Sequence, residues 1–309
     1  MKVLVTGVAG QLGYDVVNEL CRRKIDCVGS DICADYNLQI EEGCADSFSY
    51  IQMDITDIDS VRETFEIVKP DAVIHCAAWT AVDAAEEDEN IDKVIAVNYI
   101  GTRNIVSCVE KIDCKMIYIS TDYVFNGQGT TPWKPDCKDY QPLNVYGQSK
   151  LDGEGLVAIL KKYFIVRIAW VFGKNGNNFV KTMLNIGKKY DKLNVVNDQI
   201  GTPTYTYDLS KLLVDMVMTD KYGYYHATNE GGFISWYDFA VEIFKQAVEL
   251  GHDEYAKLEV NPVTTSEYGE SKAARPFNSR LDKSKLSENG FELLPTWQDA
   301  LSRYLKEIL

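Results

Sequence analysis

The chain has 309 residues, of which 46% are hydrophobic, and a formal net charge of −14. This length exceeds that of a usual single domain, so we expect two lobes, or one large α/β domain with an appendage. No apolar stretch approaches the roughly 20 residues needed to cross a bilayer, and no secretory signal opens the chain, so a cytoplasmic protein without a membrane partner is expected. The acidic balance argues against nucleic acid as a partner, because phosphate backbones need a clustered basic face.

The cysteines and histidines do not form the spacings typical of metal sites. The eight cysteines all lie in the first half of the chain, and none forms a C-x-x-C pair. Without an export signal, such cysteines are expected to be reduced thiols. Only three histidines occur, far apart and without an H-E-x-x-H pattern, so no metal site is predicted.

The chain begins with a short β-rich run from Lys2 to Val5, a glycine loop, and a helical pattern to about Arg23. In the loop T-G-V-A-G-Q-L-G the first glycine permits a tight turn, and the second lets backbone approach a pyrophosphate. The third lets the helix pack closely on the strand. Strand, loop and helix in this order predict dinucleotide binding. The residues expected to hold the cofactor here are Gly7, Gly10, Gln11, Leu12 and Gly13.

A second expected strand ends at Asp31. A carboxylate in this place is positioned to accept hydrogen bonds from the hydroxyls of the adenosine ribose, although a loop aspartate without function is the alternative. Arg22, Arg23 and Lys24 end the first helix nearby and could meet a 2′-phosphate. We therefore expect that both NADH and NADPH are used.

The next segments continue an alternation of strands and helices. Residues 32–50 form an acidic loop to which no function is assigned, a strand and turn over 50–55 follow, and a helix over 59–69 ends at Pro70. A buried strand over 71–78 and a helix over 91–111 come next. This alternation predicts a Rossmann-like, doubly wound parallel sheet with right-handed crossovers. Its further cofactor contacts are expected at Asp54, Ile55, Ala77, Ala78, Trp79 and Asn98.

The stretch from Met116 to Lys150 contains the expected catalytic groups. An apolar strand ends at Ser120 and Thr121, and a helix after Pro142 would place Tyr146 and Lys150 one turn apart on one face. A neighbouring cation lowers the pKa of a phenol, so this tyrosine could act as a general acid. A Tyr-x-x-x-Lys pair also occurs by chance in many proteins, and alone it carries little weight.

The second half of the chain loses the regular alternation. A strand over 164–173 is followed by helices over 179–189, 208–218, 235–250 and 297–308, with a turn at 201–204 and a short strand near Leu258. We therefore predict a dinucleotide-binding domain over 1–172 and a mainly substrate-binding, mixed α/β domain over 173–309. Segments around 194–228 are expected to return to the first domain.

The motifs resemble those of the extended short-chain dehydrogenase/reductase family. The glycine loop at 6–13, Asp54-Ile55, Ser120-Thr121 and Tyr146-x-x-x-Lys150 stand in that family's order. More closely, the chain is similar to the nucleotide-sugar reductases that act on dTDP-4-dehydro-L-rhamnose, through segments at 80–83, 120–125, 142–147, 178–184, 198–204 and 275–281. It departs from them at Trp79, where tyrosine or histidine is commoner, and at Ala84, where lysine is common.

This resemblance implies hydride transfer from NADPH or NADH to the C4 ketone of a nucleotide sugar. Thr121, Tyr146 and Lys150 would be catalytic, and the last two would also contact the cofactor. The residues that the resemblance assigns to the substrate are Thr80, Val82, Thr121, Asp122, Tyr123, Trp170, Asn178 and Arg275. By themselves, Trp170 could be a core aromatic and Arg275 a surface charge. The sequence leaves open whether the chain forms a homodimer.

Other functions on the same fold are the alternatives. A nucleotide-sugar dehydratase carries Asp-Glu after the strand-end threonine, whereas this chain has Asp122-Tyr123, so one required carboxylate is missing. A different nucleotide-sugar reductase or an epimerase would use the same framework. A non-catalytic, nucleotide-binding regulatory subunit need not keep the acid, so the intact Thr121, Tyr146 and Lys150 favour an enzyme.

Overall fold

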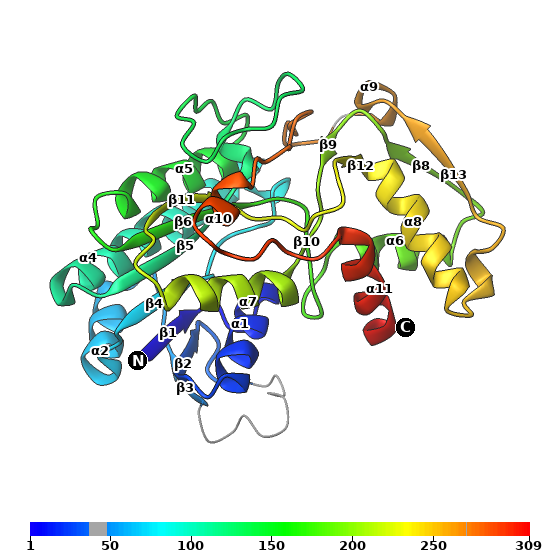
Figure 1. The fold of residues 1–309 in the computed structure, drawn as a ribbon. Coiled ribbons are helices and arrows are strands. Elements are labelled where there is room, and N and C mark those ends of the chain that lie inside the picture. Colours follow the sequence, from blue (N-terminus) through cyan, green and yellow to red (C-terminus); the bar gives the residue numbers. More distant parts are fainter. Residues whose placement is uncertain (37–47, 270) are drawn as a thin grey trace.

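A parallel β-sheet forms the centre of the larger lobe (Figure 1). The computed structural model describes residues 1–36, 48–269 and 271–309, and within these ranges the sheet has seven strands in the order β11-β6-β5-β4-β1-β2-β3. The strands are β1 (Lys2–Thr6), β2 (Asp26–Asp31), β3 (Phe48–Gln52), β4 (Ala72–His75), β5 (Lys115–Thr121), β6 (Tyr163–Ile168) and β11 (Gly223–His226). All neighbouring strands are parallel, so the predicted Rossmann-like fold is confirmed.

Helices cover both faces of this sheet. One face packs against α1 (Gln11–Arg22) and α7 (Thr206–Val217), and the other against α2 (Ile58–Val68), α4 (Thr102–Ile112) and α5 (Val145–Val157). Each face has its own buried apolar cluster. Because both faces are covered, most of the strands are short apolar runs without alternation, and the sequence located them as such runs.

Helix α5 begins after Pro142, as predicted. Its N-cap is Asn144, whose side chain accepts a hydrogen bond from the backbone N–H of Gly147 at 2.7 Å, and Pro142 lies before the cap. The capping side chain determines where the helix starts, so Pro142 is not part of its first turn. Tyr146 is consequently in the first turn of α5.

The helix predicted over 91–111 is three segments in one continuous rod. It comprises α3 (Asp88–Ile95), the π-helical segment η3 (Ala96–Gly101) and α4. A π-segment inserts an extra residue into the turn and changes the direction of side chains, a feature often found at functional sites. Asn98 lies within it.

The strand and turn predicted over 50–55 are confirmed, because β3 ends at Gln52 and Asp54 and Ile55 lie in the turn after it. Two other predicted strands end earlier than expected. The strand expected over 71–78 is β4, which ends at His75, so that Ala77 and Ala78 follow it. The strand expected over 164–173 breaks at Trp170, whose φ of +52° is outside the strand region, and it continues as β7 (Val171–Phe172), paired with β10 (Thr204–Tyr205). Of the predicted 32–50 loop, residues 37–47 lie outside the described residues.

The smaller lobe lies to the right in Figure 1 and has its own core. Its main helices are α6 (Phe179–Gly187), α8 (Trp236–Glu249) and α11 (Trp297–Ile308), and the strands β8 (Lys192–Val196) and β13 (Glu259–Val263) pair in parallel. The sequence had not indicated β8. The short elements are η2 (Ala84–Glu86), η4 (Asp122–Val124), β9 (Ile200–Gly201), β12 (Ile234–Ser235), η5 (Asp253–Tyr255), α9 (Thr265–Tyr268) and α10 (Ser284–Glu288).

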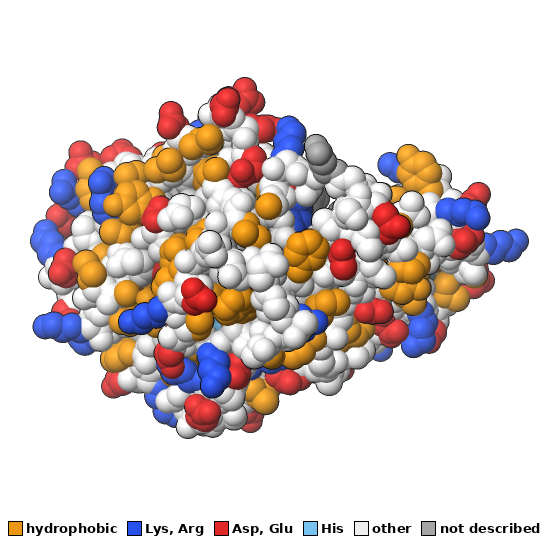
Figure 2. Space-filling model, turned by 90° about the horizontal axis from the view of Figure 1, so that it is seen from above, with side chains coloured by type: hydrophobic (Ala, Val, Ile, Leu, Met, Phe, Trp, Pro, Cys, Tyr) orange, Lys and Arg blue, Asp and Glu red, His pale blue; other side chains and the backbone are white. Residues whose placement is uncertain are grey.

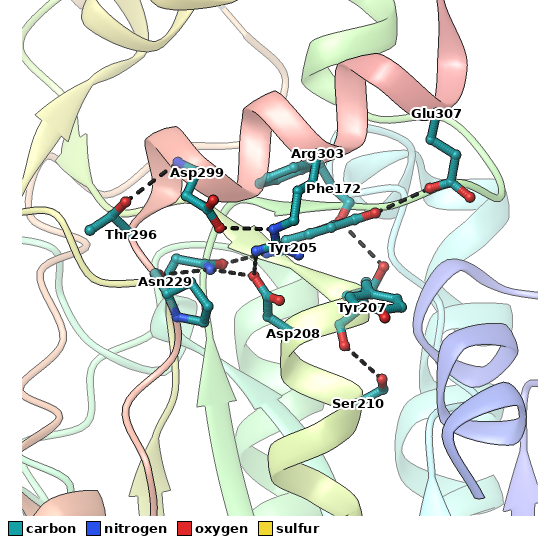
Figure 3. Close-up of polar contacts among 12 residues, drawn as sticks. Phe172, Tyr205, Tyr207, Asp208, Ser210, Asn229, Thr296, Asp299, Arg303 and Glu307 are labelled. Carbon is teal, nitrogen blue, oxygen red and sulfur yellow. Dashed lines mark hydrogen bonds and ion pairs between the residues drawn. The ribbon is translucent and has the colours of Figure 1, made fainter. Parts of the chain in front are cut away.

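A polar network joins α7 to α11 (Figure 3). The buried carboxylate of Asp208 on α7 accepts from Arg303 on α11 at 2.7 Å and from Asn229 at 2.8 Å. The phenol of Tyr205 donates to Glu307 on α11 at 3.1 Å. Since α7 packs on the larger lobe's sheet, the chain passes between the lobes more than once, and the domain boundary at residue 172 stays a prediction.

Charged side chains of both signs are interspersed on the face shown in Figure 2. No continuous basic patch stands out on that face. None of the helices in the described part of the chain is long and apolar enough to span a bilayer.

Candidate active site

The glycine loop forms a tight backbone cradle at the start of α1. Gly7 has φ +71°, and a Cβ there would lie 2.6 Å from the backbone nitrogen of Ala77. A Cβ on Gly13 would lie 2.2 Å from the carbonyl oxygen of Gly7, so only glycine allows this approach of helix and loop. Within the described chain no side chain caps α1, which leaves the N–H groups of its first turn to meet an anion.

A cavity of about 510 Å³ opens beside this cradle, at the carboxyl ends of the strands. The predicted cofactor residues that line it are Gly7, Gly10, Asp31, Asp54, Ile55, Ala77, Ala78 and Trp79. Ligands of open α/β sheets bind at this edge, where the strand order reverses beside β1. The glycine cradle, the small residues and the strand-end carboxylate together fit an extended dinucleotide.

The remaining predicted cofactor residues lie beside the cavity and do not line it. Asn98 accepts from the backbone N–H of Trp79 at 2.8 Å and donates to Ser149 of α5 at 2.9 Å. Gln11 accepts from Asn178 at 3.0 Å, and the Leu12 side chain is part of the larger lobe's core. Asn98 therefore joins the cavity wall to the helix of Tyr146.

Several cavity residues were not predicted. They are Thr6, Ser30, Ile32, Met53, Thr56, Cys76, Lys93, Ala96 and Val97. Of these, Lys93, Ala96 and Val97 follow the i, i+3, i+4 spacing of one helix face. The sequence therefore shows that these three residues share one helix face, but it does not show that this face lines the cavity.

Asp31 is held by the backbone on both sides. Its carboxylate accepts from Ala9 N of the glycine loop at 3.0 Å and from Ile32 N at 2.8 Å. The cations expected near it point elsewhere: Arg22 donates to Glu19 at 2.8 Å, and Arg23 donates to Glu19 at 2.6 Å and pairs with Asp215 of α7. Neither arginine is therefore placed to contact a 2′-phosphate on the adenosine ribose.

Thr121, Tyr146 and Lys150 meet at the end of β5. Thr121 is the last residue of β5, and the other two lie one turn apart on α5. The Lys150 side chain is 3% exposed, and its Nζ lies 4.1 Å from the centre of the Tyr118 ring. Thr121 and Tyr146 are thus brought together by two elements that pack against each other, and Lys150 lies one turn further along α5.

Burial dominates the acid–base properties of this trio. It lowers the pKa of Lys150 to about 7, although the charges of Glu154 and Cys76 raise it. Burial also raises the pKa of the Tyr146 phenol, and a hydrogen bond from Thr121 lowers it. The expected lowering by Lys150 is not among the causes, so that expectation is wrong for the protein alone.

A buried ion pair holds α5 in register with the sheet. Glu154 lies one turn after Lys150, and it accepts from Arg167 of β6 at 2.6 Å and from Ser120 of β5 at 2.6 Å. Both side chains of the ion pair are almost fully buried, with exposures of 0% and 1%. The network therefore fixes α5 against the strand that ends at Thr121.

Asp122 and Tyr123 follow Thr121 directly in η4. Asp122 is 2% exposed, and its Oδ1 accepts from Thr121 Oγ1 at 3.0 Å. The ring of Tyr123 packs edge-on against Tyr146, with 5.6 Å between centres. Both predicted substrate residues therefore lie against the catalytic candidates.

Arg275 makes a two-pronged ion pair with Asp83, at 3.0 and 2.6 Å. This pair holds the predicted segment 275–281 against the region after β4, which also contains the exposed Thr80 and the half-buried Val82. The charge of Arg275 lowers the pKa of Tyr123, against the larger effect of burial. Arg275 is thus a cation that an ion pair fixes beside Tyr123, and not an isolated surface charge.

Trp170 and Asn178 lie farther into the smaller lobe. The Trp170 ring stacks on Trp236 with 3.7 Å between centres. Asn178 caps α6 and donates to Gly173 O at 2.9 Å and to Tyr304 at 3.0 Å. The hydrogen-bonding groups of Asn178 are thus used within the protein, so its predicted substrate contact stays a prediction.

Among the residues that the structure describes, no group of three or more His, Cys, Asp and Glu side chains is placed to hold a metal ion.

Comparison with known proteins finds relatives over the full length. Residues 1–309 match the family model described as RmlD substrate binding domain. The chain is 38% identical over 307 residues to the spore coat polysaccharide biosynthesis protein SpsK of Bacillus subtilis, which covers 99% of this chain and 97% of that protein. It is 37% identical over 308 residues to a dTDP-4-dehydrorhamnose reductase of Aggregatibacter actinomycetemcomitans, with 97% of each covered.

A solved structure adds a match in three dimensions. The crystal structure of dTDP-4-dehydrorhamnose reductase from Bacillus anthracis in complex with NADP has a TM-score of 0.81, 37% sequence identity and 99% coverage of both chains. Any Rossmann protein would match the dinucleotide-binding half. These matches also include the smaller lobe. The resemblance inferred from the motifs is confirmed, and the chain belongs to the family of the RmlD substrate binding domain.

Proposed function

We propose that the chain reduces the C4 ketone of dTDP-4-dehydro-L-rhamnose to dTDP-L-rhamnose, with NADPH or NADH as the reductant. The observation that supports this proposal is that Thr121, at the end of β5, lies against Tyr146 of α5, the helix that also carries Lys150. This arrangement occurs in a chain that is 37% identical, almost end to end, to a reductase of that name. Fold alone would not decide the function, whereas a phenol and a hydroxyl that can handle a proton, in a chain so similar to a reductase, favour carbonyl reduction.

The cavity residues have positioning tasks in this proposal. Gly7, Gly10 and the first turn of α1 would hold the pyrophosphate, and Asp31 would accept hydrogen bonds from the adenosine ribose. A reduced nicotinamide supplies the hydride when it is bound. Lys150, already buried beside the site, would hold the nicotinamide ribose.

The proton is handled by this chain's own side chains. Tyr146 donates its phenolic proton to the oxygen of the former ketone as negative charge develops there. A protonated Lys150 stabilises the resulting phenolate, and Thr121 donates a hydrogen bond on the same side. Asp122, Tyr123 and Arg275 would orient the sugar and its diphosphate.

The location and assembly of the protein are part of the same proposal. We place the enzyme in the cytoplasm, with the larger lobe binding the cofactor and the smaller lobe binding most of the nucleotide sugar. A homodimer is compatible with this arrangement, and sedimentation of the purified protein over a range of concentrations would test it.

The proposed reaction is tested by supplying dTDP-4-dehydro-L-rhamnose with NADPH or NADH. Loss of nicotinamide absorbance should accompany formation of dTDP-L-rhamnose, identified by chromatography. A matched reaction with the 4-keto sugar bound to UDP in place of dTDP would test whether the base is recognised. Oxidation of neither cofactor would refute the proposal and leave a non-catalytic binding protein.

A further inference from the structure

The hydroxyl of Thr121 has a single proton, and its neighbours decide where that proton points. Thr121 Oγ1 accepts from the backbone N–H of Tyr123 at 3.2 Å and lies 3.0 Å from Asp122 Oδ1. An ionised carboxylate can only accept, so Thr121 must then donate its proton to Asp122. In that state Thr121 has no proton left for the reacting oxygen or for the phenol of Tyr146.

The surroundings of Asp122 disfavour the ionised form. The side chain is 2% exposed, and its Oδ2 has no hydrogen-bond partner among the described residues. Burial raises the pKa of Asp122 to about 6, although the nearby hydroxyls of Ser279 and Thr121 lower it. A buried carboxylate with one oxygen unsatisfied is costly, whereas the neutral acid avoids most of that cost.

We propose that Asp122 is a proton-controlled positioning residue: as a carboxylic acid it donates to Thr121 Oγ1 and so releases the Thr121 proton toward Tyr146 and the reacting oxygen. The inference rests on the proposed reduction, in which Tyr146 is the acid. In this arrangement Thr121 accepts from Tyr123 and from Asp122, which uses both lone pairs, and donates once. The Asp122 proton is held and not consumed, so the overall reaction is unchanged.

The electrostatic effects of Asp122 and Thr121 on Tyr146 also favour a protonated Asp122. Ionised Asp122 raises the pKa of Tyr146, and the hydrogen bond from Thr121 lowers it, so loss of the Asp122 proton weakens the stabilisation of the phenolate twice. The titratable groups that face Asp122 are Tyr123 on η4 and Tyr146 on α5. The Arg275–Asp83 ion pair lies beyond Tyr123.

Two groups must therefore be protonated for full activity. One is Asp122, and the other is Lys150, whose pKa burial lowers to about 7. When both lose their protons over neighbouring pH ranges, kcat/KM should fall by more than tenfold per pH unit on the alkaline side. A site with Lys150 alone would fall by about tenfold per unit at most.

The Asp122→Asn variant tests this directly. The asparagine amide is nearly the same size, donates to Thr121 at every pH, and cannot ionise. The kcat/KM of this variant should fall by no more than about tenfold per pH unit on the alkaline side. In the wild type, ionised Asp122 takes the Thr121 proton away from the reacting oxygen, and loss of such a donor costs on the order of 100-fold. The asparagine variant should lack this further loss. A purely structural role for Asp122 would leave the steepness of the profile unchanged.

Ser279→Ala supplies a second test that spares Asp122 itself. It removes a donor that favours the carboxylate, so the alkaline decline assigned to Asp122 should move to higher pH. The matched control is Ser287→Ala on α10, an exposed hydroxyl bonded to Ser284 O, which should leave the profile in place.

The outcomes separate this inference from the reaction itself. A wild-type profile with single-proton steepness, an asparagine variant as steep as the wild type, or no shift in Ser279→Ala would overturn the role of Asp122. The reduction would still stand in those cases. Failure of the wild type to oxidise either cofactor would refute the reduction and this inference with it.

Discussion

Replacement of Tyr146 and replacement of Lys150 should affect turnover and cofactor affinity differently. Tyr146→Phe keeps the ring that packs against Tyr123 but removes the transferable proton, so kcat should fall by roughly 100- to 10,000-fold. Cofactor affinity should hardly change. Lys150→Met removes a buried charge and a donor to the cofactor, so it should weaken turnover and cofactor binding together.

Tryptophan-fluorescence titration with NADPH, alongside steady-state rates, separates the two variants. Equal losses of NADPH affinity in Tyr146→Phe and Lys150→Met, or near-normal turnover in the phenylalanine variant, would show that Tyr146 is not the acid.

We expect Asp31 to govern the choice between the two cofactors. It faces the cavity with its carboxylate, Arg22 and Arg23 are engaged with Glu19 and Asp215, and no Lys or Arg occurs between Lys24 and Arg62. A 2′-phosphate would therefore meet a negative charge, and Lys93, a cation that lines the cavity, already donates a hydrogen bond to Asn90. We expect both cofactors to be used, with kcat/KM higher for NADH.

Replacement of Asp31 by Asn should lower the NADH to NADPH ratio of kcat/KM by about tenfold, equivalent to about 1.4 kcal/mol. The matched control is Asp35→Asn, which removes an exposed carboxylate close in sequence that does not line the cavity. If both variants leave the ratio unchanged, Asp31 does not contact the ribose.

At the scale of elements, a buried ion pair with the sheet holds α5, the helix of the proposed catalytic residues, in place. The Glu154–Arg167 ion pair is completely buried, so Glu154→Gln leaves a guanidinium without its counter-charge. Removing one partner of such a pair costs about 3–5 kcal/mol of the free energy of unfolding. Because α5 also carries Tyr146 and Lys150, kcat should fall even where the variant is folded.

Chemical denaturation and steady-state rates below the unfolding transition would measure these two effects. The control is Glu242→Gln, which removes the exposed ion pair with Lys245 on α8 and should cost less than about 1 kcal/mol. Similar losses in both variants would mean that the buried pair does not anchor α5.

At the scale of the whole molecule, α11 closes the smaller lobe onto α7 of the larger one (Figure 3). Asp208 is 1% exposed and Arg303 is 33% exposed, so water screens this pair more than the one on α5. Asp208→Asn should therefore cost about 1–3 kcal/mol and speed backbone hydrogen exchange in both α7 and α11. Asp299→Asn, which removes the exposed partner of Arg303, is the control and should leave α7 protected. Faster exchange confined to α11 in both variants would contradict a link between the lobes.

The sequence by itself determined the sheet-and-helix framework and the chemistry at its edge. Strands buried on both faces are continuous apolar runs, and the positive φ of Gly7 and the close approach at Gly13 leave glycine as the residue that fits, so these features can be recognised locally. The spacing of Tyr146 and Lys150 likewise places them on one helix face without knowledge of the rest of the fold.

Only the tertiary structure decided where long-range partners lie. Glu154 of α5 pairs with Arg167 of β6, and Arg275 pairs with Asp83 from a distant part of the chain. Ser279 likewise lies near Asp122, and no local pattern encodes any of these contacts. The pKa of Tyr146 was also decided by the packing. Burial raises it, whereas the sequence predicted that Lys150 would lower it. Local periodicity reports which face of an element is apolar, whereas the partners of a buried charge depend on how the elements pack.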